Sequence, residues 1–167
     1  LARLAIPATR DKVLQAFGRE TDPVARPWLA IAKVRTDIRP LPANDAAISE
    51  LVSLIAERPS AGGSAPLTDE MASRFAALAL SELADRGIAL RPAVASRAFE
   101  LLADWLPIAR LDANLTRAIL HGATALARTT PRTSLPIHRA TDVFIGALDD
   151  VRVRVAAANA LGALHDP

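Results

Sequence analysis

The last nineteen residues constrain the fold most, because their apolar spacing predicts one helix that is packed on more than one side. Asp149 and Asp150 suit an N-cap and first turn, where carboxylates accept free backbone N–H groups. One predicted face carries Val153, Ala157, Ala160, Leu161 and Leu164. A second face beside it carries Val151, Val155, Ala158 and Gly162. Small side chains let neighbouring helices approach closely, so residues 149–165 are expected to form one layer of a helix stack.

The rest of the chain divides into helices separated by capping residues, prolines and glycines. The predicted helices cover residues 9–18, 21–39, 44–57, 68–86, 92–106, 112–128 and 136–148. Gly87 is predicted to end one of them in a left-handed conformation, and Pro107 is predicted to end another. Asn44 and either Asp112 or Asn114 are predicted N-caps. Residues 58–66, rich in Pro, Ser and Gly, are predicted to form a loop. Since no segment alternates with period two, the sequence predicts an all-α fold.

An internal repeat relates three of the predicted helices. Arg74, Arg117 and Arg152 each stand nine residues before a leucine, and they are 43 and 35 residues apart. These offsets lie in the range of helical-hairpin repeats. We therefore expect a single domain over residues 1–167. Its predicted parts are a divergent first hairpin (1–40) and three repeat pairs (44–87, 91–128 and 135–165).

The pattern Asp-Asp-Val-Arg-x-x-x-Ala-Ala-x-x-Ala-Leu-Gly-x-Leu-x-Asp-Pro at residues 149–167 resembles the second helix of a HEAT repeat. The resemblance is strongest there, extends as repeated helix pairs over 68–128, and is weak before that. It implies an α-solenoid of about four antiparallel helix pairs, a HEAT-like superhelix whose second helices line the concave surface. It also implies a scaffolding role toward other proteins, with some family members binding nucleic acid, and it transfers no catalytic residue.

A polar stripe on the predicted helix 112–128 is the best candidate for a binding surface. Asn114, Arg117, His121, Thr124 and Arg128 are spaced to share one helix face. Counterparts in the other helices are Arg74, Ser81, Asp85, Arg152 and Asn159. If these helices line one surface, their arginines form a ladder that binds a partner. In the alternative, each arginine is structural and pairs with an acidic residue such as Asp112 or Asp149 near a helix start. The residues predicted to bind a partner are Arg74, Arg117, His121, Arg128, Arg152 and Asn159.

Motifs for catalysis or metal binding are absent from the sequence. His121, His138 and His165 are spread over three predicted helices without the spacing of zinc ligands. Asp104 and the two tryptophans invite comparison with HEAT-like DNA glycosylases, but Trp105 falls on a buried stripe, which favours core packing. Phosphate loops, nucleophile elbows and paired carboxylates are missing as well. The sequence thus predicts neither a cofactor nor a catalytic site.

The charge pattern leaves two classes of partner open. The net charge is only +2, and nearly all of the 20 basic residues are arginine. We expect a non-enzymatic scaffold that binds a protein segment of acidic character on its concave face. The alternative is a nucleic-acid-binding or DNA-base-processing protein with an arginine-lined groove. No apolar run is long enough to span a membrane. Because helix 149–165 is apolar on two faces, we also expect further repeats beyond Pro167 or end-to-end self-association.

Overall fold

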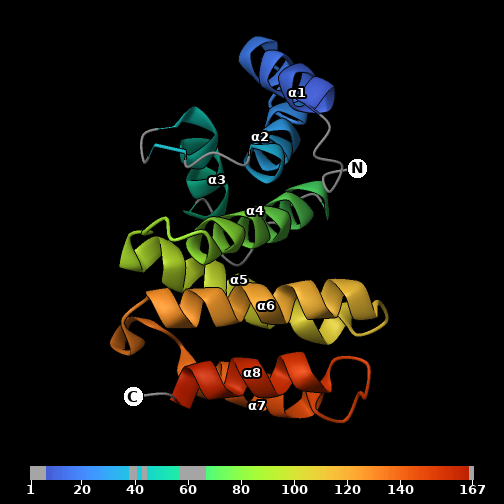
Figure 1. Cartoon of the computed structure of the whole chain (residues 1–167), viewed down its shortest axis with the longest axis vertical. Coiled ribbons are helices and arrows are strands. Elements are labelled where there is room, and N and C mark those ends of the chain that lie inside the picture. The colour runs from blue at the N-terminus through green and yellow to red at the C-terminus, as the bar shows by residue number, and fades with distance from the viewer. Residues whose placement is uncertain (1–6, 38–40, 43–44, 57–66, 166–167) are drawn as a thin grey trace.

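The protein is all-α in the residues that its computed structural model describes, which are 7–37, 41–42, 45–56 and 67–165. These residues contain eight α-helices, one short 3₁₀ helix and no strand (Figure 1). The helices are α1 (Pro7–Arg19), α2 (Ala25–Thr36), α3 (Ala46–Ala56), α4 (Leu67–Asp85), α5 (Pro92–Ala109), α6 (Ala113–Thr129), α7 (Ile137–Ala147) and α8 (Arg154–His165), with η1 (Arg132–Ser134) between α6 and α7. The predicted all-α fold is therefore confirmed for the described residues. The predicted Asn44 cap, the 58–66 loop and the Asp166–Pro167 end lie outside the described residues.

The helices follow one another in chain order down the molecule and form two layers (Figure 1). In one layer α2 packs on α4, α4 on α6, and α6 on α8. In the other layer α3 packs on α5, and α5 on α7. Each consecutive pair of helices from α1 to α6 also packs together, as do α7 and α8. α4 and α6 are thus covered on several sides, and only a narrow stripe of each faces solvent.

α2 and α4 run parallel, and the contacts between them fix their register; Figure 1 shows α6 and α8 running in the same direction as α4. Trp28 of α2 contacts Phe75 of α4, with ring centroids 5.7 Å apart, and seven residues later Arg35 of α2 pairs with Glu82 of α4 at 3.0 Å. Both contacts join residues 47 positions apart in the sequence, so the two helices point the same way. Farther along the same layer, Arg117 of α6 donates a hydrogen bond to the carbonyl oxygen of Arg152, just before α8, at 2.9 Å. That contact joins residues at the offset of 35 that the sequence repeat predicts.

A glycine brings α4 and α6 close together. A Cβ atom at Gly122 would lie 2.3 Å from the Oγ atom of Ser81 and 3.2 Å from a methyl carbon of Leu102 on α5. Real Cβ atoms do not approach other atoms as closely as 2.3 Å, so these helices can meet here only because residue 122 has no side chain. Ser81 is fully buried, and its hydroxyl donates to the Leu78 carbonyl at 2.7 Å.

Two of the predicted helix ends are confirmed. Gly87 has a φ of +81°, and the Gly87 and Ile88 amides donate to the Ala84 and Leu83 carbonyls at 2.9 and 3.1 Å. These are the two hydrogen bonds of a Schellman motif, which ends α4. Asp112 caps α6 by accepting from the Asn114 and Leu115 amides, so Asp112 rather than Asn114 is the N-cap.

Three predicted helix ends are wrong. Pro107 lies inside α5, which continues to Ala109. A proline there removes a hydrogen bond only in the last turn, and burial of Leu106 and Ala109 retains that turn. α2 begins at Ala25 and not at residue 21. Before the helix, the Asp22 carboxylate accepts a hydrogen bond from the Val24 amide at 2.8 Å.

The start of α8 is the third error. Asp150 closes a turn by accepting from the Arg152 amide at 2.9 Å, and α8 starts only at Arg154. Val153, Ala157, Ala160 and Leu164 are buried as predicted. The second apolar face is exposed instead of packed: Val151 and Val155 are each 75% exposed, and Ala158 and Gly162 face solvent. Nothing among the described residues packs over this face, since α6 and α7 cover α8 on its other sides.

Candidate partner-binding surface

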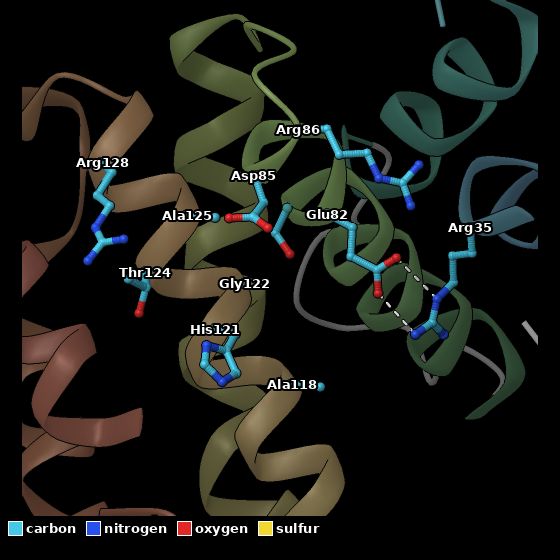
Figure 2. Close-up of a pocket in the computed structure, with 11 residues that line it drawn as sticks. Arg35, Glu82, Asp85, Arg86, Ala118, His121, Gly122, Thr124, Ala125 and Arg128 are labelled. Atoms are coloured by element: carbon cyan, nitrogen blue, oxygen red, sulfur yellow. Dashed lines mark hydrogen bonds and ion pairs between the residues drawn. The ribbon is translucent and has the colours of Figure 1, made fainter. Parts of the chain in front are cut away.

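A cavity of about 500 Å³ opens where α4 and α6 lie side by side, with α2 at its rim (Figure 2). One side is lined by Arg35 of α2, by Ser81, Glu82 and Asp85 of α4, and by Arg86, the residue after α4. Ala118, His121, Gly122, Thr124, Ala125 and Arg128 of α6 line the other. Two alanines and a glycine on α6 leave the space that larger side chains would fill. The small-residue spacing of α6 therefore creates both the close helix contact and the cavity above it.

Two of the arginines at the cavity stabilise the fold. Arg35 pairs with Glu82 through two contacts, Nη2 to Oε1 at 3.0 Å and Nε to Oε2 at 3.2 Å, as the dashed lines in Figure 2 show. Arg86 donates from Nη1 to the Val34 and Asp37 carbonyl oxygens at 3.2 and 2.9 Å. A helix leaves its last carbonyls unsatisfied, so Arg86 supplies donors to the C-terminal end of α2. Both interactions fasten α2 to α4.

Three other polar side chains at the cavity have no hydrogen-bond or ion-pair partner among the described residues. Asp85, His121 and Arg128 are exposed and make no hydrogen bond or ion pair with any described residue. Arg128 lies in the last turn of α6, where a cation interacts favourably with the helix dipole. Its five N–H donors remain available to a ligand. These groups can therefore form hydrogen bonds with a ligand without breaking any contact within the described fold.

The predicted arginine ladder divides into paired and unpaired members. Arg74 pairs with Glu70, one turn earlier on α4. Arg152 lies before α8 rather than on it, and it pairs with Asp150 at 2.7 Å. Hydrogen bonds from Arg152 lower the pKa of the Asp150 carboxyl from 3.8 to about 2. The structural alternative therefore describes these two arginines, although their partners are Glu70 and Asp150 and not Asp112 or Asp149.

The remaining predicted residues are not members of those two ion pairs. Arg117 is exposed and contacts no carboxylate; besides the Arg152 carbonyl it reaches the Asn114 side chain at 3.4 Å. Asn159 is exposed on α8 and does not line the cavity. The structure thus brings His121 and Arg128 together at one cavity, and it leaves Arg74, Arg152 and Asn159 outside that cavity.

An apolar patch that the sequence did not reveal lies beside the cavity. Its members are Val24, the residue before α2, Trp28 of α2, and Met71 and Phe75 of α4, and the first three are 63%, 38% and 37% exposed. Phe75 is half-buried between Trp28 and Trp105, whose ring centroid is 5.0 Å from that of Phe75. On α4 the patch and the cavity lie on the same side of the helix, because Met71, Phe75, Glu82 and Asp85 follow the spacing i, i+4, i+11, i+14, with the buried Leu78 at i+7 between them.

We refer to this side of the molecule, defined by the patch residues together with Glu82, Asp85, His121 and Arg128, as the groove face. Sequence periodicity could not find the patch, since it cannot tell which flank of α2 the neighbouring helix leaves uncovered. Trp105, in contrast, is 2% exposed and packs in the core as predicted. Asp104 pairs with Arg139 of α7 at 2.7 Å, so this carboxylate and tryptophan do not face a common groove.

The described residues offer neither a metal site nor a membrane-spanning helix. No group of three or more His, Asp or Glu side chains in the described residues is arranged to hold a metal ion. Of the helices described, none combines the length and apolar character needed to cross a membrane.

No protein-family model matches the chain, and no curated protein or solved structure matches it either.

Proposed function

We propose that the protein is a non-enzymatic, HEAT-like helical-repeat module that binds a segment of a partner protein along its groove face. The observation that carries this proposal is the joint presence, on one face, of an open cavity, unused polar groups and exposed apolar side chains. Protein interfaces combine an apolar centre with polar groups of this kind. The parallel register of α2, α4 and α6 supports the HEAT-like reading, because it places equivalent residues of successive helices along one surface.

Charge favours a protein partner over a nucleic acid. A phosphate backbone requires a cluster of uncompensated cations. Here Arg35, Arg74 and Arg152 are each neutralised by a carboxylate, and Asp85 faces the same cavity as Arg128. Base processing is disfavoured further, because Trp105 is buried and Asp104 is occupied by Arg139.

Site-specific photo-crosslinking tests the proposal. A photoreactive amino acid replaces His121 on the groove face or, as the control, Arg139 on the opposite layer; both positions are exposed. In nuclease-treated lysate of the source organism we expect discrete protein adducts from position 121 and not from position 139. Equal adducts at both positions would contradict the proposal.

Salt titration with nucleic acid separates the two classes of partner. We expect no binding of a 20-base-pair duplex or of single-stranded DNA at physiological salt. Binding whose logarithm falls steeply with the logarithm of salt concentration would instead indicate phosphate contacts and favour the alternative function.

A further inference from the structure

We infer that the partner segment inserts a carboxylate side chain, Asp or Glu, into the cavity beside Arg128 and seats an apolar side chain on the patch formed by Val24, Trp28, Met71 and Phe75. This inference rests on the proposed function and specifies the chemistry of the partner. Two observations carry it: the balance of charge around the cavity, and the supported, exposed apolar side chains of the patch.

The cavity has a positive charge in excess. Arg35 and Glu82 neutralise each other. Arg86 is bound by backbone carbonyls, which leave its full charge, and the Arg128 side chain has no partner among the described residues. Asp85 offsets one of these two cations, so the lining retains an attraction for a single negative charge. Arginine binds a carboxylate through two parallel hydrogen bonds, which makes Arg128 the primary recognition group. A doubly charged phosphate fits less well, because Glu82 and Asp85 face the same space.

The patch is suited to hold an apolar side chain. Trp28 is 38% exposed, but its ring is supported by Phe75, which rests in turn on the buried Trp105. An indole held in place this way loses little conformational entropy on binding, and tryptophan is enriched among the residues that dominate binding energy. The exposed Met71 adapts to the shape of the ligand.

The two subsites lie on different helices, and α2 gives a lower bound for their separation. Trp28 of the patch and Arg35 at the cavity rim both lie on the α4 side of α2, seven residues apart, which is about 10 Å at a rise of about 1.5 Å per residue. Arg128 lies on α6, which packs on the other side of α4 from α2, so the carboxylate subsite is farther from the patch than Arg35 is. The partner should therefore carry its apolar and acidic side chains more than about 10 Å apart, which is more than seven residues in a helix or about three in an extended segment.

The test begins with a library of random 16-residue peptides displayed on phage and selected against the folded protein. We expect enriched peptides to contain an aromatic or aliphatic residue and an acidic residue, separated by more than seven residues in a helical peptide or more than about three in an extended one. Their affinities are then measured by fluorescence polarisation. The tryptophans supply a second readout: Trp105 is buried, so a blue shift of emission on binding reports burial of Trp28.

Matched variants locate the two contacts. Arg128→Glu should weaken binding of the enriched peptides at least tenfold, whereas Arg19→Glu should leave it unchanged. Arg19 is the fitting control because it is also an exposed arginine in the last turn of a helix. Met71→Gln should weaken binding several-fold, and Ile145→Gln, at an exposed apolar residue of α7, should not. Replacing the peptide's acidic residue by its amide should cost the parent protein tenfold and the Arg128→Glu variant nothing.

The outcomes separate this inference from the proposed function. Peptides that lack an acidic residue, lose affinity with Met71→Gln and bind Arg128→Glu as well as the parent would overturn the carboxylate subsite while the groove face remains a binding surface. If selection enriches no peptide, or if neither Arg128→Glu nor Met71→Gln affects binding, the proposed function falls together with the inference.

Discussion

The two ends of the molecule are held together by different chemistry. From α4 to α8 the helices meet through small and apolar residues, and the closest approach depends on Gly122 against Ser81. Among α1, α2 and α3, which also share the apolar core, charged side chains add further connections. Lys33 of α2 pairs with Asp45 at 2.8 Å and lies over the Phe17 ring of α1, and Arg26 makes a similar pair with Glu50 of α3.

This difference parallels the sequence pattern, in which the arginine-to-leucine spacing occurs at residues 74, 117 and 152 but not in the first hairpin. Small residues at the contacts let the axes of neighbouring helices lie close together. In the first hairpin Arg26 would be the counterpart of those arginines, and Arg35 then stands where the leucine belongs, nine residues later. In the structure this arginine has a function of its own, since it pairs with Glu82.

The sharpest way to break the regular region is to fill its closest contact. Gly122→Ala should destabilise the protein by about 1–3 kcal/mol, the usual cost of overpacking, because the new Cβ collides with the buried Ser81 hydroxyl and a Leu102 methyl. Gly162→Ala on α8 meets nothing within 4 Å and should stabilise by up to about 1 kcal/mol through helix propensity. Urea unfolding followed by circular dichroism measures both.

A double variant identifies the cause of the Gly122→Ala effect. Ser81→Ala removes the nearest atom, so combining it with Gly122→Ala should recover part of the lost stability. If Gly122→Ala proves as stabilising as Gly162→Ala, the close approach of α4 and α6 is not a constraint, and the contrast between the two regions disappears.

The polar region is tested by removing one of its ion pairs. Lys33→Met should cost roughly 1.5 kcal/mol or more, as expected for hydrogen bonds to a charged group, because it leaves the mostly buried Asp45 carboxylate uncompensated. The control is Arg139→Met on α7, whose pair with Asp104 is largely exposed and should contribute less than about 1 kcal/mol. Equal costs in urea unfolding would show that burial does not distinguish the two pairs.

The predictable features of this fold are local ones. The Gly87 and Asp112 helix ends were predictable, since each depends on hydrogen bonds within a few residues of itself. Pro107 does not end α5 as its local preference predicts, because packing of Leu106 and Ala109 overrides that preference. The start of α8 was misplaced because Asp150 caps a preceding turn instead of the helix.

The candidate site was predictable only where one helix supplies it. His121 and Arg128 share a face of α6, so their spacing revealed them. Arg35 and Glu82 lie on different helices and are 47 positions apart, so no helical spacing in the sequence indicates that they pair. The alanines and glycine of α6, at positions 118, 122 and 125, were the signal that could have indicated a cavity. Small residues at helical spacing mark a close contact or an open space, and only the neighbouring helices decide which.

The smallest expected effect concerns the exposed pair between Asp150 and Arg152, beside the contact of α6 with Arg152. Hydrogen bonds from Arg152 depress the pKa of the Asp150 carboxyl to about 2 from 3.8. Because the pKa is lower in the folded state, the stabilisation is complete above about pH 4 and disappears as the pH falls through about 2. A carboxyl-detected NMR titration should find this pKa, and Arg152→Ala should return it toward 3.8. High salt should diminish the shift, since the pair is exposed to solvent. A parent pKa near 3.8 at low salt would show that the pair does not form in solution, and the turn before α8 would then be held by the backbone bonds of Asp150 alone.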